Sequence, residues 1–188
     1  MYNFMKRCFL ILLAFLILFC FVGCEEKYES APQIAEGEFP FVVEYEFNGE
    51  RYLIEDTVVC SWDGYDMSNN FAIFGYPYSR IWDASLKSRD KSKRVLIEFE
   101  PNAESLLVEG RNNIESRVIL SYGSGGYYLG DPNDTEYYPR INYIENYEIS
   151  SKMSKIDSTK LSNDQLEKLF GIKIIRFEFS EPIENKFE

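Results

Sequence analysis

Apolar and polar residues alternate most regularly over residues 39–58, and this alternation predicts an antiparallel β-hairpin. The first run has an apolar side chain at every second position: Phe39, Phe41, Val43, Tyr45 and Phe47. Asn48-Gly49 follows, and these residue types suit a two-residue hairpin turn because both of its positions need a positive φ. The second run continues the pattern with Tyr52, Ile54 and Val58. The hairpin should therefore have one buried, aromatic face and one polar face in water.

A two-residue turn also determines which residues face each other across the hairpin. The expected inner pairs are Phe47 with Glu50, Tyr45 with Tyr52, Val43 with Ile54, Phe41 with Asp56 and Phe39 with Val58. Cys60 has the parity of Val58, so we expect a small buried side chain and not a reactive thiol. Asp56 falls on the same face, where an unpaired carboxylate is costly. Either a bulge at Asp56-Thr57 or a strand end turns it outward, or it has a partner or acts as a functional acid.

Shorter runs predict further strands along the chain. We expect them at Phe71–Tyr78, Arg80–Leu86, Val95–Phe99, Arg117–Tyr122 and Ile172–Phe179, and a long strand or a strand pair at Tyr138–Ile149. Residues 61–70, which include Trp62, have the composition of a loop, and residues 102–109 fit either a short helix or a strand. In the last strand, Ile175, Phe177 and Phe179 should share one face, with Ile174 on the other.

One helix is predicted near the C-terminus, at about residues 162–170. Ser162 and Gln165 match a capping box, and Gly171 is the residue type that ends helices. The expected apolar face consists of Leu166, Leu169 and Phe170. The fold is therefore predicted to be mainly β, as a single antiparallel β-sandwich or strongly curved sheet with this one short helix. The domain should cover residues 39–181, and residues 182–188 should form a loose tail.

The first 24 residues have a different pattern. Lys6 and Arg7 precede an uncharged apolar run of 14 residues, Phe9–Val22, which would span ~21 Å as a helix. A bilayer needs roughly 20 residues, so the run suits a cleaved signal peptide better than the alternative of a permanent membrane helix. It ends in Phe21-Val22-Gly23-Cys24, which resembles the lipobox of bacterial lipoproteins, with Phe21 where that family usually has Leu.

The resemblance implies a signal peptide over residues 1–23 and a diacylglycerol on the sulfur of Cys24. Cys24 would then be the first mature residue, on the extracytoplasmic face of the cell membrane. Residues 24–38 are acidic and contain Pro32 and Gly37, so they are expected to form a flexible tether. Because Cys8 and Cys20 would leave with the signal and Cys24 would be acylated, the resemblance also implies that Cys60 has no partner for an intrachain disulfide.

Composition narrows the possible functions. After residue 23 the chain has 18 basic and 31 acidic side chains, a formal net charge of −13. Nucleic acid is therefore not expected as a partner, since phosphate binding needs clustered Lys and Arg. The sequence contains no histidine, which excludes Ser-His-Asp and Cys-His catalysis.

The strongest indication of a binding site is a concentration of tyrosines. Residues 122–147 hold seven of the fourteen tyrosines, with adjacent pairs at Tyr127-Tyr128 and Tyr137-Tyr138. If each pair lies in a strand, one ring of each should point outward, where tyrosine can stack on a sugar or hold a partner protein. The alternative is that tyrosine simply favours half-buried strands. The candidate binding residues are Tyr127, Tyr128, Tyr137, Tyr138 and Trp62.

Other motifs are weaker, and we expect neither a metal nor a cofactor. An acidic stretch at residues 131–136 begins like a calcium loop, but Thr135 replaces a ligand, so a solvated turn is favoured. Ser88 and Lys91 match Ser-x-x-Lys of penicillin-recognising enzymes without the accompanying motifs. The surrounding basic segment, Lys87–Arg94, is interpreted as a solvated loop. The glycines at 123–126 lack a following Gly-Lys-Ser/Thr and are interpreted as a turn between strands.

The leading hypothesis is therefore a membrane-anchored, extracytoplasmic lipoprotein with a non-catalytic binding or interaction module. Its ligand would be a glycan, a peptide or an envelope protein. One alternative is a structural or assembly subunit of the cell envelope. The other is an envelope hydrolase that uses paired carboxylates, although 31 acidic residues make some close pair expected by chance.

Overall fold

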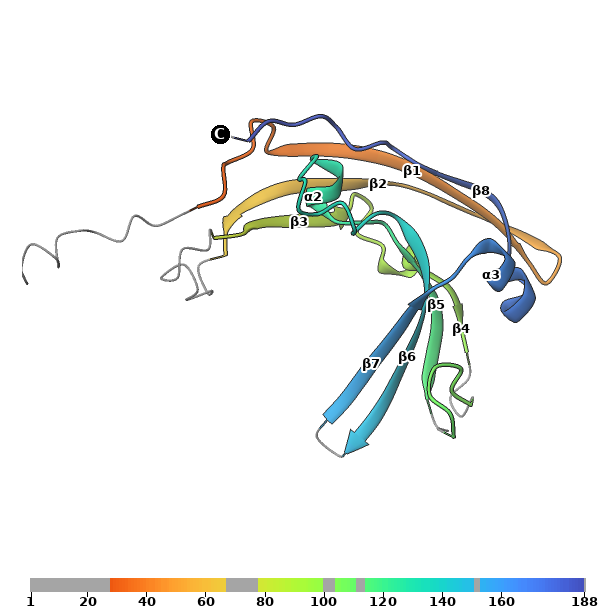
Figure 1. Ribbon diagram of the computed structural model, residues 1–188. Helices are drawn as coiled ribbons and strands as arrows, with labels where there is room; N and C mark the ends of the chain where they lie inside the picture. Colours follow the sequence, from red (N-terminus) through yellow and green to blue (C-terminus); the bar gives the residue numbers. More distant parts are fainter. Residues whose placement is uncertain (1–27, 67–77, 100–103, 111–113, 151–152, 188) are drawn as a thin grey trace, which may run out of the picture. The chain divides into compact units, whose positions relative to one another are not determined.

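The computed structural model describes residues 28–66, 78–99, 104–110, 114–150 and 153–187 (Figure 1). The chain divides into two compact units, Met1–Glu29 with Tyr65–Ser79 and Ser30–Gly64 with Arg80–Glu188. In the first unit, the Tyr28 ring lies 4.9 Å from the rings of Tyr65 and Tyr78. The second unit contains the two β-sheets. Cys24 and most of the strand predicted at Phe71–Tyr78 lie outside the described residues.

The first sheet is built on the predicted hairpin. It contains β1 (Glu36–Phe47), β2 (Glu50–Tyr65), β3 (Arg80–Leu86) and β8 (Lys173–Phe179), in the order β3-β2-β1-β8. Asn48 and Gly49 have φ values of 53° and 78°, as the turn requires. Tyr45 faces Tyr52 and Phe41 faces Asp56, so the predicted register is confirmed.

The second sheet contains β4 (Val95–Glu98), β5 (Glu115–Ser121), β6 (Arg140–Ser150) and β7 (Met153–Lys160), in the order β4-β5-β6-β7. Its strands pair antiparallel throughout. β7 was not predicted, because its sequence is mostly polar and Ile156 is exposed. Residues 104–110 form neither a helix nor a strand.

The inner faces of both sheets contribute to one hydrophobic core. β1 and β2 supply Phe39, Phe41, Val43, Tyr45, Ile54, Val58 and Cys60, and the second sheet adds Val118, Leu120, Ile141 and Tyr143. A hydrogen bond of 3.3 Å from the Tyr45 hydroxyl to the Leu96 carbonyl links the sheets directly. Burial raises the pKa of the Cys60 thiol to about 12, so the expected inert, buried cysteine is confirmed. The fold is mainly β, with two antiparallel four-stranded sheets.

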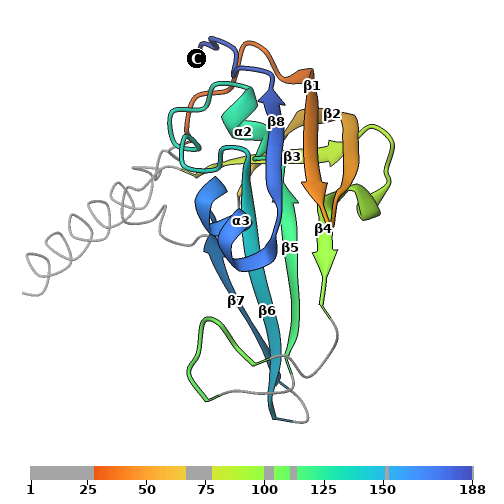
Figure 2. The ribbon, with the colours of Figure 1, turned by 90° about the vertical axis from the view of Figure 1, so that its right-hand side faces the viewer.

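Among its described residues, the second unit also contains three short helical segments: η2 (Lys91–Arg94), α2 (Gly125–Tyr128) and α3 (Asn163–Phe170). The capping box of α3 is present, and Gly171 ends the helix at a φ of 68°. Leu166 is fully buried, but Leu169 is half exposed, so its expected place on the apolar face is wrong. In Figure 2, α3 connects β7 of the second sheet to β8 of the first.

A bulge in β8 changes which of its side chains face the core. Val43 pairs with Phe177, whereas Tyr45 pairs with Ile174, so Ile175 is the extra residue. Ile174 therefore packs against the core and Ile175 is exposed, which reverses the predicted faces at these two positions. Phe177 and Phe179 keep their predicted face.

Asp56 is buried and satisfied by partners. It lies opposite Phe41 without a bulge, and its side chain is 5% exposed. The Ser88 hydroxyl and the Thr57 N–H donate hydrogen bonds to it, and Lys93 lies 3.2 Å away. Burial alone would raise the pKa of this carboxyl, but these contacts hold it below its ordinary value. A bulge or strand end was the wrong explanation, and the alternative of a partner is correct.

Hydrogen bonds join the segment before β1 to the segment after β8. Ile34 N–H donates to the Asn185 side chain at 3.0 Å, Asn185 donates back to the Ile34 carbonyl at 2.8 Å, and Gln33 N–H donates to the Lys186 carbonyl at 2.8 Å. Residues 30–38 are therefore not a free tether, and residues 182–187 are not the loose tail that we expected. Among the described residues, no helix has the length and apolar character needed to cross a membrane.

Candidate functional site

The loop from Gly123 to Pro139 seats α2 against β3. A Cβ at Gly125 would lie 2.4 Å from the Asp83 carbonyl oxygen, and a Cβ at Gly126 would lie 2.2 Å from a carboxyl oxygen of Asp134. These two glycines allow α2 to approach the sheet closely. The prediction of a turn between strands here is therefore wrong, because residues 125–128 form a short helix that Ser124 caps and that packs against β3.

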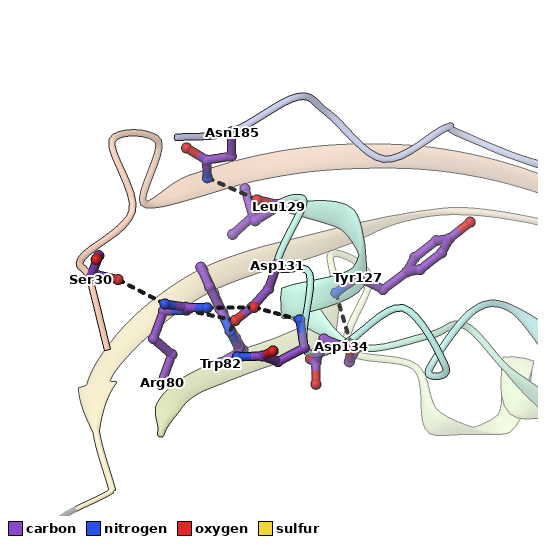
Figure 3. A network of polar contacts seen from close by, with 10 residues as sticks. Ser30, Arg80, Trp82, Tyr127, Leu129, Asp131, Asp134 and Asn185 are labelled. Atoms are coloured by element: carbon purple, nitrogen blue, oxygen red, sulfur yellow. Dashed lines mark hydrogen bonds and ion pairs between the residues drawn. The ribbon is translucent and has the colours of Figure 1, made fainter. Parts of the chain in front are cut away.

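A buried ion pair ties this loop to β3 (Figure 3). The Arg80 guanidinium donates to both carboxyl oxygens of Asp131, at 2.8 and 2.7 Å, and the Trp82 indole N–H donates to Asp131 at 2.7 Å. Both charged side chains are at most 5% exposed. Burial alone would raise the pKa of Asp131, but these hydrogen bonds hold it below its ordinary value. Asp131 is thus a structural anchor and not part of the solvated turn that we expected.

The C-terminal segment closes over the other side of the loop. Ile183 N–H donates to the Tyr128 carbonyl at 2.9 Å, and the Asn185 amide donates to the Leu129 carbonyl at 2.8 Å. Figure 3 shows Asn185 reaching Leu129 from the C-terminal segment. These bonds place residues 180–181, which follow β8, beside α2.

A groove lies between the end of β8 and this loop. Its volume is about 470 Å³, and it is lined by Tyr127, Tyr138, Pro139, Phe177, Glu178, Phe179, Ser180 and Glu181. Figure 2 shows α2 on the side of β8 that faces away from β1. The size falls within the range of ligand sites in proteins. This groove is the candidate functional site.

One wall of the groove is aromatic, and the other carries acidic side chains. On the aromatic wall, Lys160, which does not itself line the groove, donates a hydrogen bond to the Tyr138 hydroxyl, and its ammonium lies 4.6 Å from the centre of that ring. The contact with Lys160 lowers the pKa of Tyr138. On the other wall stand Glu178 and Glu181. Burial, and then the charge of Glu181, raise the pKa of Tyr127. An occupant therefore meets aromatic rings on one wall and carboxylates on the other.

The groove also runs along an open sheet edge. β8 is the last strand of its sheet, and Ser180 N–H donates to the Pro40 carbonyl of β1 at 3.2 Å. Hydrogen bonding alternates along an antiparallel strand, so the backbone groups of Phe177 and Phe179 point away from β1, toward the groove. Within the described part of the chain, no strand pairs with this edge. The edge thus offers unpaired backbone donors and acceptors next to aromatic side chains.

The groove includes two of the five predicted binding residues. Tyr127 and Tyr138 line it. Tyr128 is fully buried and stacks on Phe39 at 4.7 Å, Tyr137 is exposed but does not line the groove, and Trp62 is half buried in β2. Neither tyrosine pair lies in a strand, so the expected alternation of faces does not apply.

Sequence reasoning missed the β8 side of the groove. Phe177 and Phe179 alternate with Glu178, which indicated an ordinary half-buried strand. Phe177 is nevertheless 37% exposed, because the groove lies over it. The local sequence of β8 does not reveal that β8 is the edge strand of its sheet.

The buried carboxylates of the second unit are engaged by other groups. Glu145 is fully buried and accepts hydrogen bonds from the Ser105 hydroxyl at 2.5 Å, the Leu106 N–H at 2.6 Å and the Tyr143 hydroxyl at 2.9 Å. The carboxylates of Asp56 and Asp131 likewise accept hydrogen bonds from several neighbouring groups. Such carboxylates hold loops in place, and none of the three lines the groove.

Among the described residues, no group of three or more Cys, Asp or Glu side chains is arranged to hold a metal ion. Comparisons of the chain with known protein families, with curated proteins and with solved structures return no match.

Proposed function

We propose that this protein is a membrane-anchored, extracytoplasmic lipoprotein whose β domain is a non-catalytic binding module. The proposed ligand is an extended peptide segment of a partner protein, bound in the groove beside β8. One observation carries this proposal: an aromatic groove of about 470 Å³ runs along the unpaired edge of β8.

A peptide suits this groove because it can extend the sheet. Its backbone would pair with the outward groups of Phe177 and Phe179, as in recognition by strand addition. Alternate side chains of the peptide would then meet Tyr127 and Tyr138 on one side and Glu178 on the other. Glu178 is also paired with Arg176 at 2.5 Å, so Glu181 is the acid better placed to meet a basic side chain.

The best test uses a display library of short peptides, selected against the full chain in a neutral detergent. We expect selected peptides to alternate apolar and basic residues, and Tyr138→Ala to weaken their binding by ~10-fold or more. Tyr137→Ala is the matched control, because the adjacent ring is exposed and does not line the groove.

Backbone pairing is tested separately with synthetic copies of a selected peptide. Methylation of alternate backbone nitrogens should abolish binding in one register and spare it in the other. Equal tolerance in both registers would refute strand addition. Retention of oligosaccharides or peptidoglycan fragments, without peptides, would instead assign the tyrosines to sugar stacking.

The proposed anchor rests on the first 24 residues. Replacing Cys24 with Ala should move the protein from the membrane fraction to the soluble fraction. If the Cys24→Ala protein stays with the membrane, lipid attachment at this residue is refuted, and the uncleaved membrane helix becomes the better explanation.

A further inference from the structure

A second cavity lies at the connection between β3 and β4, away from the residues of the β8 groove. Its volume is about 320 Å³, and its lining includes Leu86, Arg89, Asp90, Lys91, Arg94 and Tyr122. In Figure 2 this connection, with η2, lies at the right-hand side of the view. The cavity therefore coincides with the basic segment that the sequence predicted to be a solvated loop.

The five cations of this segment divide into two groups. Lys87 forms an ion pair with Glu38 at 2.6 Å, and Lys93 forms one with Asp56 at 3.2 Å. Arg89, Lys91 and Arg94 line the cavity instead, and none of them has an ion pair with a described acidic residue. With Asp90, the ionisable side chains of the lining have a formal net charge of +2, in a protein that is strongly acidic.

The segment is held in shape by its own contacts. The Asp90 carboxylate accepts hydrogen bonds from both the N–H and the hydroxyl of Ser92, at 3.0 and 2.6 Å. Ser88 bonds to the buried Asp56 on the first sheet, and Arg89 adopts a φ of 57°. The three cations therefore stand on a turn whose backbone is defined before any ligand arrives.

Arg94 has hydrogen-bonding capacity that the described residues do not use. Its guanidinium lies over the Tyr122 ring, with 5.0 Å from its central carbon to the ring centre. Its buried Nε–H has no acceptor among the described residues. Stacking on a ring fixes the orientation of the guanidinium N–H donors, and this arrangement suits the binding of an oxyanion.

We infer that this cavity binds a small organic phosphate dianion. The formal charge of the lining matches a phosphate monoester, whose second pKa is near 6, so it is largely dianionic at neutral pH. The apolar part of the ligand would pack on Leu86 and Tyr122. This site is independent of the peptide groove proposed above.

Phenyl phosphate is the probe, titrated into the full chain in neutral detergent and followed by ligand-observed NMR. For a ligand of this size we expect a Kd on the order of 1 mM or tighter. Benzoate, a monoanion, should bind more weakly, and benzyl alcohol, which is uncharged, should not compete. Inorganic phosphate should compete weakly, because it lacks the apolar part.

Arg94→Gln and Lys91→Gln should each weaken binding by ~10-fold or more. Lys87→Gln is the matched control, because it removes a cation from the same segment that is paired outside the cavity. Since Lys91 is exposed, Lys91→Gln should fold, and it therefore tests phosphate binding even if Arg94→Gln does not fold. Tyr138→Ala should leave phenyl phosphate binding unchanged, which separates this site from the groove.

Three results would overturn the inference. Binding of benzyl alcohol as tight as that of phenyl phosphate would make the cavity merely apolar. A loss of binding in Lys87→Gln equal to that in Lys91→Gln would indicate general attraction to positive charge. The third is an absence of detectable binding at concentrations well above the expected Kd.

Discussion

Tyr127 and Tyr128 are neighbours in the chain, yet they belong to two regions of different character. Tyr128 is fully buried and stacks on Phe39, within a region fastened by the Arg80–Asp131 pair and by the C-terminal segment. Figure 3 shows the Tyr127 ring pointing away from that network. It lines a groove along a sheet edge with which no strand among the described residues pairs. The contrast indicates that this loop has a structural side and a recognition side.

The sharpest way to test this contrast is to truncate each tyrosine in turn. Tyr128→Ala should lower the free energy of unfolding by ~3–5 kcal/mol, because it removes a fully buried aromatic ring. Tyr127→Ala should lower it by about 1 kcal/mol, because that ring is only half buried. Denaturant titration of the full chain measures both. Equal losses would contradict the division into two sides.

The ion pair of the structural side gives the next largest effect. Arg80→Met leaves the Asp131 carboxylate buried without its partner, and should cost ~3–5 kcal/mol. Arg51→Met is the control: its guanidinium is paired with Glu44 but 68% exposed, so its loss should cost about 0–1 kcal/mol. A small effect for Arg80→Met would mean that water reaches the network in Figure 3.

The same pair should make stability depend on acid pH. The pKa of Asp131 in the folded protein lies below the ordinary 3.8, so the unfolded chain takes up the proton more readily. The stabilisation is therefore present at neutral pH and is lost as the pH falls below about 4. Asp131→Asn should show a shallower decline in unfolding free energy over this window. Asp56, whose pKa is also lowered, contributes to the decline that remains.

The smallest expected effect has the opposite sign. The hydroxyl of Tyr128 is buried and has no hydrogen-bond partner among the described residues. Burial raises the pKa of this hydroxyl, as expected for a group far from water. Tyr128→Phe removes an unsatisfied polar atom and keeps the ring, so it should raise the unfolding free energy by about 1 kcal/mol. A loss of stability would show that the hydroxyl has a partner after all.

The hairpin and the capped helix could be predicted from the sequence because the interactions that form them lie within short segments of the chain. Asn48-Gly49 needs positive φ values, and a two-residue turn then determines every pair from Phe39–Val58 to Phe47–Glu50. Ser162 and Gln165 satisfy backbone groups within one helical turn. These features do not depend on the rest of the chain.

The candidate site could be predicted only in part. Tyrosine density correctly indicated the region of Tyr127 and Tyr138, but the assumption of strands misplaced Tyr128. Gly125 and Gly126 form part of a helix because β3 lies directly against them. The partner side of the groove comes from β8, about 40 to 50 residues later in the chain. No local pattern contains a contact over that distance.

The sequence by itself determined the mainly β fold, the hairpin and its register, the capped helix and the burial of Cys60. It also contains the lipobox-like pattern at residues 21–24 on which the proposed anchor at Cys24 depends. Only the tertiary structure decided that Asp56 and Asp131 have buried partners, that a bulge turns Ile175 outward, and that an open edge of β8 faces aromatic rings. The reason is physical: turns, caps and alternation are set by neighbouring residues, whereas burial of charge and exposure of an edge depend on what packs from elsewhere.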